Sequence, residues 1–393
     1  MRARKGIRSD YLAFGKPNFS EREIGAVSRA MRSGWIGMGP ETIAFEKELA
    51  RFVGAPQVVT VNSCTSALFL SLLAHSIGPG DEVLCPSLTW CSTANAALYL
   101  GATPVFCDVD PDTLCATPEL LAAKVSRRTR AAIVVHMGGL AADMSAIRRA
   151  LPRRITLVED AAHAFGAAYP NGRPVGSSGN LVCYSFYANK NLSTGEGGAV
   201  ALFDDGMAAR LRALRLHALP IDAWKRYSNP RSLMLSSMLT ELGYKMNYTD
   251  LQASIGRVQL SRQREFTARR LAVAKHYQAA LEPARPRIGL QRGAVSARHS
   301  RHLFTVILPT ARMRITRDEF ILDLRARNIG ASVHYAALHE MPLYRGKRRA
   351  VRLPVSEAVS RAIVTLPISA SMTVSDARYV TRHFLELYRA TLA

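Results

Sequence analysis

Residues 57–77, QVVTVNSCTSALFLSLLAHSI, indicate the fold class of this chain. A short β-branched run, QVVTV, is followed by the small residues NSCTS and then by an apolar segment of helical character. A strand that leads directly into a helix is typical of a βαβ unit. The helix start also offers hydroxyl groups and free backbone N–H groups, which can bind phosphate. The alternative is that Ser63 or Thr65 serves only as the N-cap of the helix.

The alternation continues to about residue 205. Six more β-branched runs follow, namely DEVLCP, TPVFCDVD, AAIVVHM, RITLVED, LVCYSFY and GGAVALF, and helix-like segments separate several of them. This pattern predicts an α/β fold with a mostly parallel sheet flanked by helices. Beyond it come a long charged helical segment, SRQREFTARRLAVAKHYQAALEP, and shorter strands such as HLFTVILP. We therefore expect a large α/β domain over residues 1–254 and a smaller C-terminal α+β domain over residues 255–393.

The composition is that of a globular protein. Hydrophobic residues make up 48% of the 393 residues and charged residues 21%, enough to build a core. No apolar stretch is long enough to cross a bilayer, and no apolar region follows the basic N-terminus, so we expect a cytoplasmic protein without a membrane partner. The six cysteines contain no C-x-x-C pair, which predicts reduced core cysteines and no metal site.

The net charge of +22 comes mostly from arginine spread along the chain, with clusters such as SRRTR, RRALPRR and YRGKRRAVR. None of these clusters has interleaved aromatic residues or belongs to a recognisable nucleic-acid module. We therefore expect no nucleic-acid partner. A basic surface that attracts a substrate carrying phosphate is the interpretation we favour.

Two further strand ends carry candidate catalytic residues. Asp160 ends the run RITLVED, with His163 three residues later, and a buried carboxylate there needs a cationic partner. The alternative is a helix cap or a structural hydrogen bond. Lys190 follows LVCYSFY and precedes the glycine-rich TGEGG; a desolvated ammonium loses its proton readily and becomes a nucleophile. Taken alone, Lys190 would be a surface residue.

Together these sites suggest a cofactor. The carboxyl ends of parallel strands meet at one edge of a sheet, so a phosphate-binding helix start, a carboxylate and a lysine would meet there. These are the groups needed to hold pyridoxal 5′-phosphate (PLP). Trp90, in the turn PSLTWCSTANA, could stack on the flat ring of the cofactor, and plain core packing is the alternative.

Several ordered motifs then resemble one known family. They include FGKPNFSEREIGAVSRAMRSGWIGMGP, VEDAAHAFGA, SFYANKNLSTGEGGAV, GYKMNYTDLQASIGRVQL and SVHYAALHEMPLY, and they run over almost the whole chain. The chain resembles the DegT/DnrJ/EryC1/StrS family of PLP-dependent sugar aminotransferases. The resemblance implies the type I aspartate aminotransferase fold, with the smaller C-terminal domain described above.

The resemblance also implies residue roles. Lys190 would form the Schiff base with PLP and move the proton, and Asp160 would pair with the pyridine nitrogen. The remaining cofactor contacts would come from Cys64 (through its backbone), Thr65, Trp90, His163, Ser185 and, from a neighbouring subunit, Asn247. The expected assembly is therefore a homodimer with shared active sites. Substrate contacts would come from Trp35, Lys245, His334, Tyr335 and His339, although the last three could be satisfied core groups.

The reaction implied by the resemblance is a ping-pong transfer. L-glutamate would give its amino group to the C4 keto group of a nucleotide-linked sugar. Examples of such a sugar are a UDP-4-keto-pentose and a dTDP- or UDP-4-keto-6-deoxyhexose. The product would serve lipopolysaccharide or antibiotic biosynthesis. Ile36, Gly37 and Met38 depart from the hydroxyl-bearing pair usual in the family, and Asn189 stands where threonine is usual. A keto-cyclitol aminotransferase of the same family and a non-catalytic regulator that binds nucleic acid are the alternatives.

Overall fold

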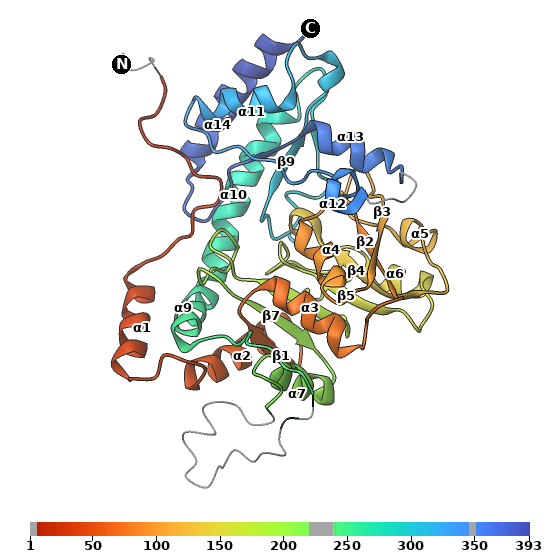
Figure 1. Cartoon of the computed structure of the whole chain (residues 1–393). Coiled ribbons are helices and arrows are strands. Elements are labelled where there is room, and N and C mark those ends of the chain that lie inside the picture. Colours follow the sequence, from red (N-terminus) through yellow and green to blue (C-terminus); the bar gives the residue numbers. More distant parts are fainter. Residues whose placement is uncertain (1–5, 220–238, 240, 346–350) are drawn as a thin grey trace.

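The computed structural model describes residues 6–219, 239, 241–345 and 351–393. Its centre is a seven-stranded sheet in the order β1-β7-β6-β5-β4-β2-β3 (Figure 1). The strands are β1 (Gln57–Val61), β2 (Glu82–Pro86), β3 (Thr103–Cys107), β4 (Thr129–Val135), β5 (Thr156–Asp160), β6 (Leu181–Ser185) and β7 (Gly198–Leu202). β7 is antiparallel to both of its neighbours, and all other neighbouring strands are parallel. The predicted α/β class is confirmed.

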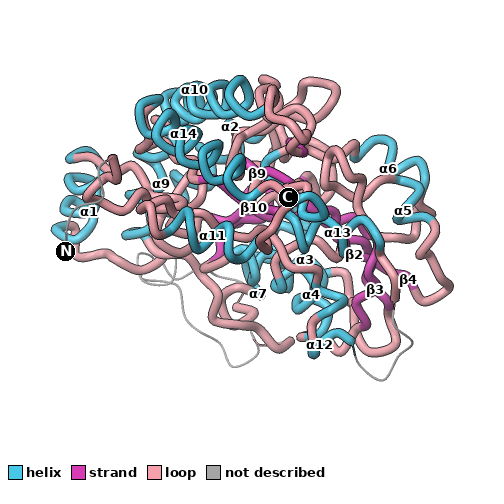
Figure 2. The backbone as a smooth tube through the Cα atoms, turned by 90° about the horizontal axis from the view of Figure 1, so that it is seen from above, coloured by secondary structure: helices cyan, strands magenta, loops and turns pink. Residues whose placement is uncertain are grey.

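Both faces of this sheet are buried. In β4, Ala131 and Ile133 belong to one hydrophobic cluster, and Ala132 and Val134 belong to another. Because successive side chains of a strand point to opposite faces, each face carries its own core, and Figure 2 shows helices on either side of the strands. The helices of this part are α1 (Glu21–Arg32), α2 (Pro40–Val53), α3 (Cys64–Ala74), α4 (Cys91–Leu98), α5 (Pro118–Ala122), α6 (Met144–Ala150) and α7 (Asp205–Leu214).

The C-terminal part has a core of its own around a three-stranded antiparallel sheet, β10-β9-β8. Its strands are β8 (Gly289–Leu290), β9 (Phe304–Ile307) and β10 (Ile363–Leu366), and its helices are α9 (Asp250–Ser261), α10 (Gln263–Leu281), α11 (Arg317–Arg325), α12 (Pro342–Arg345), α13 (Pro354–Ala362) and α14 (Val374–Thr391). In Figure 1, α10 runs from the region beside α9 towards α11 and α14. The predicted boundary between residues 254 and 255 falls within α9, and the division into two domains stays a prediction.

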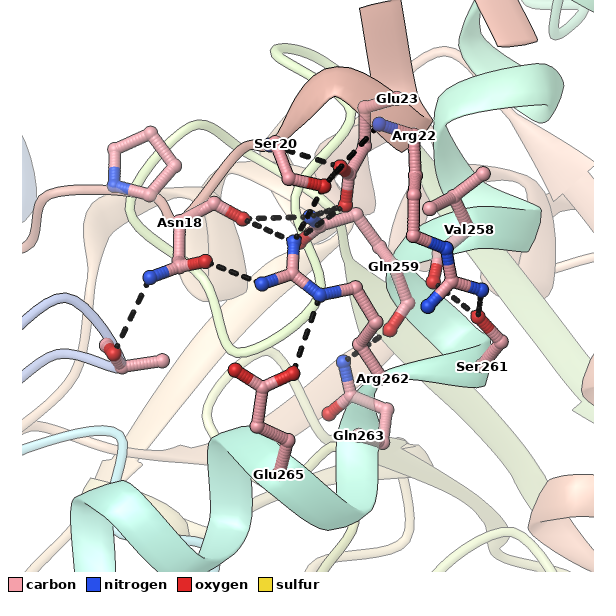
Figure 3. Close-up of polar contacts among 12 residues, drawn as sticks. Asn18, Ser20, Arg22, Glu23, Val258, Gln259, Ser261, Arg262, Gln263 and Glu265 are labelled. Atoms are coloured by element: carbon pink, nitrogen blue, oxygen red, sulfur yellow. Dashed lines mark hydrogen bonds and ion pairs between the residues drawn. The ribbon is translucent and has the colours of Figure 1, made fainter. Parts of the chain in front are cut away.

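Arg262 separates α9 from α10 and anchors the N-terminal segment there (Figure 3). Its guanidinium donates to Glu23 of α1 at 2.9 Å and to the side chain of Asn18 at 2.6 Å. Gln259 also donates to Glu23, at 2.7 Å. Although burial disfavours the charged carboxylate, hydrogen bonds from Ser20, Arg262 and Gln259 hold the pKa of Glu23 below its usual range.

Three features bear on the expectations about the membrane, metals and cysteines. No helix among the described residues has the length and apolar character to span a bilayer. The described part of the chain also contains no group of three or more His, Cys, Asp or Glu side chains that could hold a metal ion. All six cysteines are free thiols, and five of them are buried.

Candidate active site

The site lies at the edge of the large sheet where the parallel strands end. Val61, Asp160 and Ser185 are the last residues of β1, β5 and β6, and Gly198 begins β7 opposite both Val61 and Ser185. A cavity of about 430 Å³ opens at this edge. The predicted site residues that line it are Cys64, Thr65, Trp90, Asp160, His163, Ser185, Lys190, His334 and Tyr335.

The start of α3 forms one wall of the cavity. The Ser63 hydroxyl caps this helix by accepting a hydrogen bond from the Ser66 N–H at 3.1 Å, so the capping alternative holds for Ser63. Thr65 lies in the first turn and lines the cavity instead. The backbone N–H groups of Cys64 and Thr65 have no acceptor within the helix, because the first turn of a helix leaves its N–H groups free. The helix start therefore suits a phosphate.

A glycine allows this helix start to approach the sheet closely. A Cβ atom on Gly198 would lie 2.5 Å from the carbonyl carbon of Ser63 and 2.6 Å from the Cys64 nitrogen. Real Cβ atoms do not come so close to backbone atoms. Any side chain at position 198 would therefore push the start of α3 away from this edge of the sheet.

Asp160 is held by two hydrogen bonds. The Thr93 hydroxyl donates to Oδ2 at 2.8 Å, and the Ala162 N–H donates to Oδ1 at 3.1 Å. The side chain is almost fully buried but borders the cavity. We expected a cationic partner for this carboxylate, and no such partner lies within ion-pair distance among the described residues. Polar donors of the protein hold the carboxylate in place, and its position leaves it available to a positively charged group in the cavity.

Lys190 reaches the same cavity from the loop after β6. The cavity leaves the side chain partly accessible, while the protein packed around it disfavours the ammonium. Burial therefore lowers the pKa of Lys190 to about 8, against the opposing influence of Cys64 and Asp160. A substantial fraction of this amine is thus neutral near physiological pH, as a nucleophile requires.

Three histidines surround Lys190. Burial first, and then the charge of Lys190, hold the pKa of His163 and of His302 well below the usual range. The same causes lower the pKa of His334 to about 3. All three rings are therefore neutral at physiological pH. His163 shares a hydrogen bond of 2.9 Å with the Tyr335 hydroxyl through its Nε2 atom.

Trp90 stands at the N-cap position of α4 with 60% of its surface exposed. Its ring centroid lies 5.9 Å from that of Tyr335. Because the side chain borders the cavity and is not part of a core cluster, the alternative of plain core packing is wrong. The exposed ring offers an aromatic face to a flat ligand.

Four predicted site residues do not line the cavity. His339 is buried, 2.6 Å from the Ser87 hydroxyl and 3.4 Å from Glu357, which identifies it as a satisfied core group. The other three, Trp35, Lys245 and Asn247, lie in two neighbouring segments that are joined by a hydrogen bond from the Asp250 N–H to the Gly37 carbonyl. The segment of Lys245 and Asn247 flanks the start of α3, because the Asn62 N–H donates to the Met246 carbonyl.

The sequence reasoning missed two residues of the site. Thr93 lies one turn into α4, where the sequence reads as an ordinary apolar helix. His302 precedes β9, more than a hundred residues from Lys190 in the chain, and yet its Nε2 lies 3.4 Å from the Lys190 Nζ atom. No local pattern could have identified either residue, because each becomes part of the site only when distant segments pack together.

The residues present fit PLP. A helix start with free N–H groups, an isolated buried carboxylate and an amine of lowered pKa lie around one cavity. In addition, the Nδ1 atoms of His163 and His302 are buried and have no hydrogen-bond partner among the described residues. Buried polar atoms are usually satisfied, so these two atoms suit a polar ligand.

Comparison with known proteins agrees with this chemistry. Residues 17–385 match the model of the DegT/DnrJ/EryC1/StrS aminotransferase family. The chain is 40% identical over 373 residues to the spore coat polysaccharide biosynthesis protein SpsC of Bacillus subtilis. The matched region covers 94% of this chain and 95% of SpsC. Among solved structures, the PLP form of Spr1654 from Streptococcus pneumoniae is 28% identical with a TM-score of 0.88, covering 98% of this chain and 100% of that one. DesI, solved in the presence of its TDP-sugar product, is also 28% identical with a TM-score of 0.86, covering 98% and 95% of the two chains.

Proposed function

Because this chain belongs to the DegT/DnrJ/EryC1/StrS aminotransferase family, and is therefore a PLP-dependent sugar aminotransferase, we propose that it transfers an amino group from L-glutamate to the C4 keto group of a nucleotide-diphosphate sugar. The observation that carries the proposal is the meeting of Lys190, Asp160 and the start of α3 at one cavity. The similar protein DesI, which was solved in the presence of its TDP-sugar product, supports a nucleotide-linked substrate.

In this proposal, PLP supplies an electron-accepting ring that stabilises negative charge at the carbon next to the amine. Asp160 pairs with the ring nitrogen and keeps it protonated, and the hydrogen bond from Thr93 fixes the orientation of the carboxylate. Trp90 covers one face of the ring. Lys190 holds the cofactor covalently and, once released, moves the proton.

The other contacts follow from the residues at the cavity wall. Thr65, Ser185 and the Cys64 N–H hold the phosphate, where the free N–H groups of α3 favour an anion. His163 would contact the 3′-oxygen of the cofactor, and His334 and Tyr335, which line the same cavity, would border the substrate. Because burial lowers the pKa of Lys190 to about 8, the lysine amine is not fully protonated and can accept the substrate proton.

We further propose a homodimer with shared sites. Lys245 and Asn247 lie beside the start of α3 but, like Trp35, do not line the cavity of their own chain, which supports roles at the site of a second copy. In mixed dimers of a Lys190→Ala chain and an Asn247→Ala chain, one of the two sites would regain both residues. We expect mixing two nearly inactive variants to restore about a quarter of the wild-type activity, because half of the random dimers carry one intact site. No recovery on mixing would contradict the shared site.

The experiment that tests the reaction uses purified protein. It should absorb visible light, and borohydride should fix the cofactor on the peptide that contains Lys190. L-glutamate should convert the cofactor to its amine form, and a UDP- or dTDP-4-keto-sugar should restore the aldehyde form. Restoration by a keto-inosose alone would favour the keto-cyclitol alternative. A protein that cannot be loaded with PLP would overturn the proposal.

The substrate charge agrees with the charge of the protein. A net charge of +22 raises the local concentration of anions near the surface, and a nucleotide diphosphate sugar is an anion whereas a keto-cyclitol is neutral. Family membership leaves the non-catalytic alternative without support. The role of SpsC in polysaccharide biosynthesis supports an amino sugar destined for a polysaccharide.

A further inference from the structure

His302 lies in direct contact with the amine of Lys190. The distance between Lys190 Nζ and His302 Nε2 is 3.4 Å, and the imidazole is 3% exposed. No other side-chain hydrogen bond of Nζ occurs among the described residues. His302 belongs to the segment that leads into β9, so it reaches the cavity from the C-terminal part of the chain.

The direction of this hydrogen bond follows from the chemistry of the two groups. A lysine ammonium has three donors and no acceptor. A histidine that faces it must therefore accept through an unprotonated nitrogen. Burial, and then the positive charges of Lys190 and Arg270, disfavour a further cation at His302, so the ring stays neutral and can accept.

The backbone around His302 is fixed to both sides of the cavity. The Ser300 hydroxyl donates to the His163 carbonyl at 2.6 Å, and the Asn191 side chain donates to the Ser300 carbonyl at 2.9 Å. Since Asn191 follows Lys190, this second bond joins the histidine segment to the lysine loop.

Two further contacts complete the attachment. The Ser300 N–H donates to the Gly139 carbonyl at 3.0 Å. Arg270 of α10 donates to the Arg301 carbonyl at 3.2 Å and to the Ile368 carbonyl at 3.1 Å. A Cβ atom on Gly139 would lie 2.2 Å from the Ser300 hydroxyl, so this close approach requires glycine. The position of the imidazole is thus determined by several independent contacts.

From this geometry we propose that His302 is a positioning residue for Lys190: its Nε2 accepts a hydrogen bond from the lysine amine and keeps the lone pair directed into the cavity. The inference rests on the proposed function. A neutral amine has two N–H groups and one lone pair. Because His302 engages an N–H, the lone pair remains free to take the substrate proton, and the ammonium that results keeps the same partner until it returns the proton.

Several charged or titratable groups face Lys190, and each must be considered in a pH experiment. They are Asp160 at the end of β5, Cys64 at the start of α3, and the three histidines His163, His302 and His334. Asp160 and Cys64 favour the ammonium, and burial opposes it. A variant at position 302 leaves all of these other groups in place.

The test measures the Lys190 amine directly. The full-length chain, stripped of cofactor with hydroxylamine, is treated with methyl acetimidate, which reacts only with neutral amines. Labelling of the Lys190 peptide is followed by mass spectrometry from about pH 6 to about pH 11, a range that brackets the ordinary and lowered pKa values of lysine. The variants are His302→Phe, which keeps a ring but has no acceptor, and His302→Gln, whose amide oxygen can accept. The matched control is His276→Phe, because His276 lies on α10, shares a hydrogen bond with Thr381 and does not line the cavity.

We expect His302→Phe to shift the labelling midpoint of Lys190 downward by about one pH unit, because the ammonium loses a charge-assisted hydrogen bond. His302→Gln should stay close to wild type, and His276→Phe should be unchanged. In the holoenzyme, His302→Phe should lower kcat by about tenfold with little change in KM, and His302→Gln should recover part of the loss. If His302→Phe does not fold, His302→Leu takes its place.

An unchanged or raised midpoint in folded His302→Phe, with normal PLP loading of the wild type, would overturn the positioning role alone. A wild-type protein that does not attach PLP at Lys190 would instead overturn the proposed function. The two failures are therefore distinguishable.

Discussion

The hydroxyl of Thr93 donates a hydrogen bond of 2.8 Å to Oδ2 of Asp160. Thr93 is completely buried in α4, and the Thr89 hydroxyl lies 3.0 Å from its own hydroxyl. The two threonines thus connect the turn after β2 with the end of β5. Among the described residues, the Thr93 hydroxyl has no hydrogen-bond partner besides Asp160 and Thr89, so its position helps to set the orientation of Asp160.

Thr93→Val keeps the shape of the side chain and removes the donor. A hydrogen bond to a charged group contributes roughly 1.5–3 kcal/mol, so we expect kcat to fall about 10- to 100-fold while the protein still binds PLP. Thr93→Ser, which keeps the hydroxyl, should remain within about threefold of wild type. Steady-state kinetics with glutamate and a keto-sugar checks both variants. Equal activity in the valine and serine variants would show that Asp160 needs no orientation by Thr93.

Loading of PLP should depend on pH through Lys190. Burial lowers the pKa of this amine to about 8, and only the neutral amine attacks the cofactor aldehyde. The loading rate should therefore rise about tenfold per pH unit below that value and level off above it. Stopped-flow absorbance of the stripped chain mixed with PLP measures the profile. A profile that keeps rising towards the value of an ordinary lysine would show that the amine is solvated.

Gly198→Ala tests the close approach between β7 and the start of α3. The added Cβ would meet the backbone of Ser63 and Cys64 at 2.5 to 2.7 Å, and overpacking of this kind costs roughly 1–3 kcal/mol. We expect the affinity for PLP to fall about tenfold or more, because the phosphate-binding turn moves. Gly78→Ala is the control, since a Cβ there meets nothing within 4 Å. Cofactor titration followed by fluorescence compares the two variants, and equal affinities would contradict the phosphate assignment.

Arg262→Ala tests what holds the N-terminal segment. Arg262 and Glu23 are 9% and 3% exposed, at a distance of 2.9 Å (Figure 3). Removing one partner of a buried ion pair leaves the other charge uncompensated, at a cost of about 3 kcal/mol in the free energy of unfolding. The exposed pair Arg361 and Glu340, 3.0 Å apart, is the control, and Arg361→Ala should cost less than about 1 kcal/mol. Chemical denaturation measures the free energy of unfolding of both variants. Similar losses of this free energy in the two variants would contradict the role of burial.

The pH dependence of that pair has a definite sign. The pKa of Glu23 in the folded protein is below its usual range, so the carboxylate binds its proton less readily when folded than when unfolded. Its contribution to stability is present above the unfolded pKa and is lost as the pH falls through the lower, folded pKa. The stability difference between wild type and Glu23→Gln should therefore shrink as the solution is acidified.

Much of the fold follows from local pattern. Runs such as QVVTV and LVCYSFY became β1 and β6 because β-branched and apolar residues favour strands buried on both faces. The site at the strand ends was predictable for the same reason, since parallel strands bring Asp160 and the loop to Lys190 to one edge. The break at Arg262 was not predictable, because it depends on ion pairs with Glu23, more than two hundred residues away.

The sequence by itself determined the α/β class, the family and the residues that could hold PLP, because strand and helix periods and the order of motifs are local properties. Only the tertiary structure decided which groups surround those residues. It gave Asp160 a hydrogen bond from a threonine, gave Lys190 a histidine from the C-terminal part, and placed His339 outside the cavity. The reason is physical: hydrogen bonds and burial depend on distances between segments, and packing sets those distances after the local elements have formed.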